Sequence, residues 1–448
     1  MTKISRTTDM TQGSEMRHII MFSLPLLAGN LLQQTYNIVD TMVVGRYLGD
    51  DALAAVGATG SITYLFYTLC IGLSVGAGII VAQYFGAGKK KALRSAVFNS
   101  ALVTAIFGIV ISLLSVPAAK PILELLKVPD KLIGDSAVYM QIACGGTIAV
   151  AAYNWINAIM RALGDSKTPL IFLGAASLLN ALLDLLFVVV FKFGIAGAAW
   201  ATVLTQALSA ISCIVYCFAV SGEIKLTADD LHTDKDMMSR CVKTGVPIAI
   251  QNGLISVSMV ALQRVTNGFG ETVMAAYTVS MRIEQFVQQP FSSLNAAVST
   301  FTGQNIGAGQ EKRAQKGLAC AIKISVIFSA VVLVLFTLFG GAITSWFVKG
   351  KTVISISAKA LIITSLFYWS LGIIHTTRGF LNGAGDTNYA LVNGMAEVIC
   401  RIGLILTRIA FIGYWGIWYT TAATWFVTAM VSLIRYKGGK WRLHSIVK

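Results

Sequence analysis

Four acidic residues stand inside long apolar stretches of this chain: Asp40, Asp184, Glu284 and Glu397. In a lipid bilayer an ionised carboxylate costs at least about 2.5 to 3.5 kcal/mol, so it must face a cavity, a partner or a proton. Each of the four is therefore a candidate functional residue, and binding of an ion or a polar ligand is the chemistry to test first.

Asp40 and Asp184 form the strongest candidate pair. With a helix rise of about 1.5 Å per residue, Asp40 is expected roughly 9 Å below the outer end of its helix, Asp184 about 12 Å and Thr202 about 11 Å. Asn180 stands one turn before Asp184 on the same helix face. The four side chains form a predicted cation-coupling site, suited to Na+ or to a carboxylate pair that binds and releases protons. The alternative is that both aspartates are only hydrogen-bonded structural residues.

The first apolar stretch carries a polar face. Gln33, Asn37 and Asp40 are spaced by four and three residues, with Tyr36 beside them, and we expect this face to line a substrate cleft. Aromatic rings and amides suited to a flat organic cation are also offered by Tyr139, Tyr153, Asn154 and Asn157. Anchoring at the lipid interface is an equally ordinary use of tyrosine.

The second half of the chain offers a different polar set. Glu284 and Glu397 lie near the middle of apolar stretches, Arg401 follows Glu397 by four residues, and His375 lies in the preceding stretch. Because residues four apart share a helix face, Glu397 and Arg401 can simply neutralise each other. A function of these four residues in substrate or proton binding is the other interpretation.

The composition places these residues in a membrane protein. Of the 448 residues, 56% are hydrophobic and 12% charged, and the mean hydropathy is +0.72, which lies outside the range of soluble globular proteins. Because a helix needs roughly 20 apolar residues to cross a bilayer, the sequence predicts an all-α integral membrane protein with twelve transmembrane helices. The predicted spans are 17–46, 52–83, 93–118, 134–161, 168–191, 195–220, 240–266, 274–304, 315–340, 353–383, 387–408 and 414–435.

The chain is an internal repeat. The segment from Gln83 to Gly88 returns from Gln304 to Gly309, 221 residues later, and Pro25 and Pro247 are 222 residues apart. Six crossings separate the copies, so the repeats are parallel, and we expect two six-helix lobes with a central cleft. The Gly-Ala-Gly that ends each segment lacks the lysine and flanking strand of a phosphate-binding loop, so we interpret it as a turn.

The acids of the first half are not repeated. In the second copy Leu262 takes the place of Asp40, and Ile405 takes the place of Asp184. Because duplication keeps what folding requires, residues carried by one half alone are candidates for ion coupling.

Charge and proline positions complete the predicted organisation. Most of the 35 lysines and arginines lie in loops on one side, so both termini are expected to be cytoplasmic, and topology rather than nucleic-acid binding accounts for the net charge of +15. Prolines are candidate hinges at Pro25, Pro247 and Pro290. The predicted domains are a tail (1–16), an N-terminal lobe (17–220), a cytoplasmic linker (221–239), a C-terminal lobe (240–436) and a second tail (437–448).

These features together resemble the multidrug and toxic compound extrusion (MATE) family of cation-coupled efflux transporters. The resemblance covers nearly the whole chain and is carried by these segments: Pro25, Asp40–Gly45, Gln83–Gly88, Arg161–Asp165, Asn180 with Asp184, Gly194–Thr202, and Gly307–Gly309. It implies twelve helices around a central cleft and drug efflux driven by inward movement of sodium ions or protons. It also implies that Asp40, Asn180, Asp184 and Thr202 form the cation site of the N-terminal lobe.

One departure from the family matters. A branch of the family binds sodium through acids in the seventh and tenth spans, where this chain has Gln251, Asn252, Ser256 and Ser258 in the seventh and His375 in the tenth. A sodium site of that type is therefore not expected here.

The resulting prediction is an antiporter of the inner membrane that exports amphipathic, often cationic, organic compounds while protons or sodium ions enter. We expect it to act as a monomer in contact with membrane lipid, with no cofactor beyond its coupling ion. One alternative is a flippase for lipid or oligosaccharide-lipid. A flippase is expected to bind phosphate through a cleft rich in arginine, and the predicted spans offer little beyond Arg282 and Arg401. A membrane-embedded enzyme would need clustered Asp for a metal ion or a His with a carboxylate partner, and the sequence shows neither pattern. An ion channel would need a symmetric selectivity filter, and no segment of the sequence suggests one.

Overall fold

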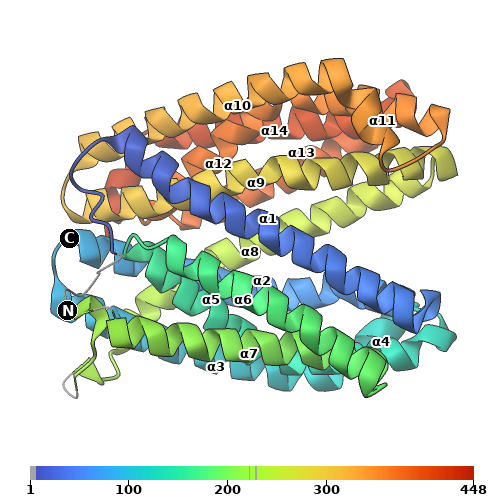
Figure 1. Ribbon diagram of the computed structural model, residues 1–448. Coiled ribbons are helices and arrows are strands. Elements are labelled where there is room, and N and C mark those ends of the chain that lie inside the picture. The colour runs from blue at the N-terminus through green and yellow to red at the C-terminus, as the bar shows by residue number, and fades with distance from the viewer. Residues whose placement is uncertain (1–6, 221, 228–229, 448) are drawn as a thin grey trace. The chain divides into compact units, whose positions relative to one another are not determined.

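The computed structural model describes residues 7–220, 222–227 and 230–447, without the side chains of residues 61 and 406–411 (Figure 1). Parts of the predicted tails and linker, namely residues 1–6, 221, 228–229 and 448, lie outside this description. Over the described residues the regular structure is helical throughout, with no strand. The prediction of an all-α protein is confirmed.

The helices fall into two compact units. Unit 1 contains Ala28–Ile250 and the residues before Met10, and unit 2 contains Met10–Leu27 and the chain from Gln251 onward. The helices of unit 1 are α2 (Asp50–Gly86), α3 (Lys90–Leu125), α4 (Asp130–Gly145), α5 (Thr147–Ala162), α6 (Lys167–Asp184) and α7 (Ile195–Val220), with short helices at Leu185–Val190 and Gly222–Ile224. Those of unit 2 are α9 (Glu271–Gly307), α10 (Glu311–Ser345), α11 (Lys351–Ser365), α12 (Tyr368–Gly383), α13 (Asn388–Ile412) and α14 (Gly416–Lys437), with short helices at Gly413–Trp415 and Lys440–His444.

Two helices belong to both units. The division falls inside α1 (Glu15–Leu48), after Leu27, and inside α8 (Lys235–Asn267), after Ile250. The candidate hinge prolines Pro25 and Pro247 stand two or three residues before these points, inside continuous helices. The predicted lobes 17–220 and 240–436 assign α1 and α8 whole, so their boundaries stay a prediction, as do the hinges.

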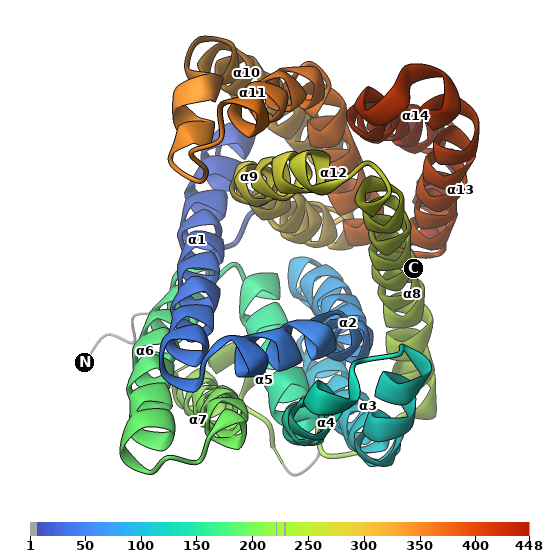
Figure 2. The same ribbon diagram turned by 90° about the vertical axis from the view of Figure 1, so that its right-hand side faces the viewer.

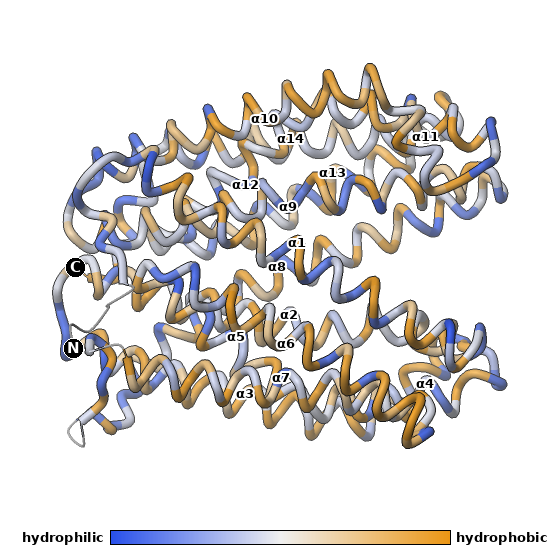
Figure 3. Tube along the Cα trace, in the orientation of Figure 1, coloured by the Kyte–Doolittle hydropathy of each residue, from blue (hydrophilic) through white to orange (hydrophobic). Residues whose placement is uncertain are grey.

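The helices match the twelve predicted spans. Within the described part of the chain, seven helices are long and apolar enough to cross a membrane, and two bent pairs, α4 with α5 and α11 with α12, raise this to nine. The other three spans correspond to the long helices α1, α9 and α13, which carry more polar residues. Hydrophobic residues follow α3, α7 and α10 along most of their length (Figure 3). Neighbouring helices include α6 with α7 and α13 with α14 (Figure 2).

The fourth and tenth spans are bent, which corrects the continuous spans expected at 134–161 and 353–383. The bends measure 43° between α4 and α5 and 50° between α11 and α12. At each break a backbone N–H donates three residues back instead of four, from Ala149 to Gly146 and from Ser370 to Phe367. Such tighter turns redirect the helix axis. Neither break contains a proline, so the proline positions did not reveal them.

The repeated Gly-Ala-Gly segments end helices, as predicted. After α2, Gly88 has φ +65° and Lys89 donates its backbone N–H to the Tyr84 carbonyl; after α9, Gly309 has φ +73° and Gln310 donates to Asn305. A left-handed glycine with such a bond stops a helix by satisfying its last carbonyl groups. The segments thus allow α3 and α10 to begin at once.

Two aromatic clusters hold α12 in unit 2. At its start Tyr368 packs against Phe291 and Trp425, and near its end Phe380 packs edge-on against Trp441 at 4.8 Å between ring centroids. Buried aromatic rings supply large apolar contact area and fix orientation. The helix is therefore anchored on both sides of the polar residues in its middle.

Candidate functional site

The predicted aspartate pair comes together in unit 1. Asp40 projects from α1, while Asp184 is the last residue of α6, immediately before the π-helical turns of Leu185–Val190. A π-helical segment widens the helix locally and is frequent at functional sites. The two carboxyl groups are within electrostatic reach of each other.

Three other side chains surround the carboxyl pair. Tyr36 lies beside Thr202 and close to both aspartates, and Tyr139 is also within electrostatic reach of both. Thr202 donates a hydrogen bond to the Ala198 carbonyl at 3.2 Å. The structure thus gathers Asp40, Asp184, Thr202, Tyr36 and Tyr139, which the sequence had proposed in two separate groups.

The pair and its neighbour Asn180 hold unsatisfied polar atoms. Asn180 and Asp184 are each only 1% exposed. Asp40 Oδ1, both Asp184 oxygens and both side-chain polar atoms of Asn180 are buried without a hydrogen-bond partner. Because each such atom typically costs about 1–3 kcal/mol, their concentration in one place favours a ligand that satisfies them.

The chemistry of this donor set fits a proton or a hard monovalent cation. Carboxylate, amide and hydroxyl oxygens are available from Asp40, Asp184, Asn180 and Thr202. Such oxygen ligands suit hard cations, whereas His and Cys suit transition metals. Among the described residues no group of three or more His, Cys, Asp or Glu is placed to hold a metal ion.

The remaining cleft candidates of unit 1 have other contacts. Gln33 donates to Asn37 at 3.4 Å along the exposed face of α1. On α5, Asn154 donates to the Val150 carbonyl at 2.8 Å, and Tyr153 interacts with Asn157. The contacts found for these residues lie outside the aspartate pair.

Tyr67 was missed by the sequence reasoning. Its hydroxyl donates to the Ala143 carbonyl at 2.9 Å and is within electrostatic reach of Tyr36 and Tyr139. Tyr67 thus belongs with Tyr36 and Tyr139 to a group of tyrosines near the two aspartates. Its only signal in the sequence was a polar group inside the span 52–83, which does not identify a partner.

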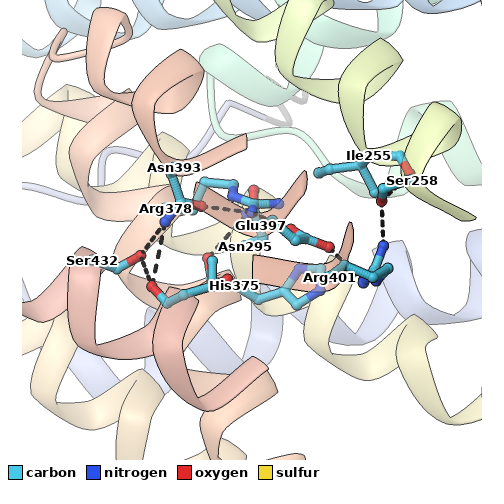
Figure 4. A network of polar contacts seen from close by, with 10 residues as sticks. Ile255, Ser258, Asn295, His375, Arg378, Asn393, Glu397, Arg401 and Ser432 are labelled. Carbon is cyan, nitrogen blue, oxygen red and sulfur yellow. Dashed lines mark hydrogen bonds and ion pairs between the residues drawn. The ribbon is translucent and has the colours of Figure 1, made fainter. Parts of the chain in front are cut away.

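Unit 2 contains a charged cluster in the middle of α12 and α13 (Figure 4). Glu397 pairs with Arg401 one turn later on α13, with 3.0 Å between Oε1 and Nη2. A second guanidinium, that of Arg378 on α12, lies 3.5 Å from the other Glu397 oxygen. Arg401 also bonds Ser258. The ion pair considered from the spacing therefore exists, but it is part of a larger group.

Arg378 is the second residue that the sequence reasoning missed. Its Nη2 donates to Asn393 Oδ1 at 2.7 Å, and Asn393 in turn donates to Ser432 Oγ at 2.8 Å. A charged residue inside the span 353–383 was the available signal. Its link to Glu397 joins two helices and could not be found from spacing along one helix.

Neither His375 nor Glu284 takes part in an ion pair among the described residues. The His375 ring stacks on Phe291 at 6.3 Å, and its backbone carbonyl accepts a hydrogen bond from Asn295 at 2.9 Å. Glu284 lies beside Thr364 and Tyr368, with its Oε1 buried and unpartnered. Both are polar groups held in an aromatic environment.

The MatE family model matches the chain twice, at residues 25–186 and 247–407. The chain belongs to the MATE family. The two matches begin at Pro25 and Pro247, so they reproduce the internal repeat. As a MATE protein, the chain is a multi-pass membrane transporter and not an enzyme.

Several curated proteins are similar along their full length. "Probable multidrug resistance protein YpnP" of Bacillus subtilis is 28% identical over 437 residues, which cover 97% of both chains. "Probable multidrug resistance protein YoeA" of the same organism is 28% identical over 99% of this chain and 97% of its own. "Probable multidrug resistance protein NorM" of Thermotoga maritima is 23% identical over 96% of this chain and 94% of its own.

Solved MATE structures share the fold. An outward-facing multidrug resistance MATE transporter of the MOP superfamily has a TM-score of 0.91 at 22% identity, covering 98% of this chain and 99% of that one. A crystal structure of MATE in the bent conformation has a TM-score of 0.89 at 23% identity, with the same coverage. The twelve-helix, two-lobe architecture predicted from the sequence is thereby confirmed.

Proposed function

We propose that this MATE protein is a secondary antiporter that exports amphipathic, often cationic, organic compounds while protons or sodium ions move inward. Three relatives that match nearly the whole chain are named multidrug resistance proteins. The observation that carries the coupling proposal is the Asp40–Asp184 pair with its unsatisfied buried oxygens.

The carboxyl pair can couple ion binding to a change of conformation. Binding of one cation or proton changes the local charge by one unit and satisfies oxygens that otherwise lack partners. Asp40 lies on α1 and Asp184 on α6, so the change acts on the packing between these helices. Two conformations that differ in affinity for the ion would then alternate with its occupancy.

The proposal includes the setting of the transporter. We place the protein in the cytoplasmic membrane with both termini inside, as a monomer that contacts lipid and small organic molecules. The coupling ion, H+ or Na+, is its only proposed cofactor. A potential of about 100 mV supplies roughly 2.3 kcal/mol for each charge that moves, enough for uphill export when several charges or a concentration gradient contribute.

Transport in liposomes tests this function. Purified protein is reconstituted, a fluorescent cation is followed, and a pH gradient and a sodium gradient are applied separately. One of the two gradients should drive dye movement, and Asp40→Asn should abolish it while leaving reconstituted protein and dye binding in place. Thr41→Val, a change at the neighbouring position, serves as the control for disturbance of α1. Full gradient-driven transport by Asp40→Asn would disprove the coupling proposal.

A further inference from the structure

The charged cluster of unit 2 carries a surplus positive charge. Glu397 is within ion-pair distance of both Arg378 and Arg401. Among the residues described in the structure, no other acid forms an ion pair with either arginine. One carboxylate neutralises one guanidinium, so a positive charge stays without a counter-ion inside a membrane-spanning bundle, where it is costly.

The other ionisable side chains considered in unit 2 do not supply the missing negative charge. Asp386 forms its ion pair with Arg435 at 2.7 Å. Glu284 lies against Thr364 and Tyr368. His375 adds no negative charge in either protonation state. The missing charge is therefore not supplied by a contact within the described part of unit 2.

Arg378 is the more accessible of the two guanidinium groups. Its side chain is 14% exposed, whereas that of Arg401 is fully buried. The Nε–H groups of both arginines lack a partner. A guanidinium presents five N–H donors in a fixed fork, and Arg378 therefore has donor capacity left for an incoming ligand.

The surroundings of Arg378 hold it in one orientation. Asn393 accepts from its Nη2 and is itself bonded to Ser432, so the guanidinium plane is fixed through a second residue (Figure 4). Beside it lies a small cavity lined by Arg378, Leu381, Asn382, Tyr389, Ala390, Asn393 and Ser432. The cavity has a volume of about 180 Å³. That room suits one oxygen of a ligand's anionic group, with the rest of the ligand lying outside the cavity.

We propose that Arg378 is the centre of an anion-binding subsite in unit 2, which receives the carboxylate of an amphipathic organic ligand. Arg378 Nη2 is already engaged with Asn393 and Glu397, but its Nε–H lacks a partner and can donate a charge-assisted hydrogen bond to a carboxylate oxygen. The bound anion supplies the missing counter-charge. The subsite rests on the proposed export function and extends it: cargo that carries a carboxylate beside its cationic part is accepted as well as simple cations.

A matched pair of dyes tests the subsite. Rhodamine 6G is an ethyl ester with a single positive charge, and its free acid differs by one carboxylate on the same ring system. Binding of each dye to purified, detergent-solubilised protein is followed by fluorescence anisotropy. Arg378→Gln should weaken binding of the acid by about tenfold or more, the loss expected for a charge-assisted bond, while binding of the ester stays within twofold.

Two further variants separate this function from a structural one. Arg282→Gln removes an exposed arginine of α9 in the same unit and should change neither dye. Arg378→Lys keeps the charge beside Glu397 but loses the unpartnered Nε–H donor, so it should weaken binding of the acid severalfold relative to the ester. This variant carries the test if Arg378→Gln does not give folded protein by size-exclusion chromatography.

The outcomes are distinct. Equal weakening of both dyes would show that Arg378 only supports the fold, and an unchanged ratio of acid to ester affinity in both Arg378 variants would also overturn the proposal. Competition by added phosphatidylglycerol that depends on Arg378 would assign the site to a lipid headgroup instead. Because the measurement needs no transport, failure of ion-coupled export in liposomes leaves its result intact.

Discussion

At the residue scale, the ion-pair arithmetic of unit 2 gives a prediction of stability. Glu397→Gln leaves two buried guanidinium groups without a counter-ion, and loss of one partner from a buried ion pair typically costs about 3–5 kcal/mol. Arg401→Met removes the surplus charge and leaves Glu397 paired with Arg378, so it should cost less. Thermal unfolding of the two purified variants compares them, and the larger drop in midpoint is expected for Glu397→Gln.

A larger drop in thermal midpoint for Arg401→Met than for Glu397→Gln would contradict the conclusion that the cluster has one positive charge in excess. Ser258 does not obscure the comparison, because its hydroxyl also donates to the Ile255 carbonyl at 2.8 Å and keeps that bond when Arg401 is replaced. Lys323→Met, a change at an exposed lysine of α10, controls for the removal of any positive charge from unit 2.

Residues were predictable from the sequence where one helix decides their position. Helix rise predicts a common depth for Asp40 and Asp184, and the cost of a carboxylate in lipid predicts that each faces a cavity, a partner or a proton. Arg378 and Tyr67 were missed because their significance depends on partners in other helices. Spacing along a helix gives the face of a residue but not the neighbour that this face meets.

At the element scale, close contact between α2 and α8 inside unit 1 depends on small residues. A Cβ added at Gly72 would lie 2.5 Å from the backbone nitrogen of Ala249, and one at Gly76 would lie 2.7 Å from Gly245. On each helix the small residues are four positions apart, the spacing that brings membrane helices together. The contact thus belongs to the segment of α8 that precedes the division between the units.

Gly72→Ala should therefore separate α2 from α8. An overpacked contact typically costs about 1–3 kcal/mol, and the thermal midpoint of the purified protein should fall accordingly. Gly60→Ala is the matched control, because it lies on the same helix with no atom within 4 Å of the added Cβ. A similar effect of both substitutions would indicate that helix propensity, and not contact with α8, is responsible.

The helix bends show what periodicity leaves undetermined. Length and hydropathy located all twelve spans, but α4–α5 and α11–α12 appeared as uninterrupted stretches. The bends arise from a few backbone hydrogen bonds, such as that from the Ala149 N–H to the Gly146 carbonyl. The pattern of apolar residues does not predict where such bonds form. At Gly146 the reason is partly tertiary, since a Cβ there would clash with the Val203 side chain.

At the scale of the whole molecule, duplication kept the fold and changed the chemistry. The Gly-Asp pair at 164–165 returns at 385–386, and both glycines have positive φ, +82° and +92°. Asp165 accepts from the backbone N–H groups of Lys167 and Thr168 at the start of α6, while Asp386 pairs with Arg435 of α14. The repeat thus predicts backbone geometry in both halves, but it does not predict the partner of a side chain.

Membrane topology is the remaining whole-molecule prediction. Lys91, at the start of α3, follows an even number of crossings, and Lys349, before α11, follows an odd number; both are exposed. Lysine and arginine favour the cytoplasmic side, so Lys91 should face the cytoplasm and Lys349 the outside. Each is changed to Cys in a background without the seven native cysteines, and intact cells are treated with a membrane-impermeant maleimide. Lys349→Cys should react at once and Lys91→Cys only after permeabilisation, whereas the opposite pattern would place both termini outside and reverse the direction of the proposed export.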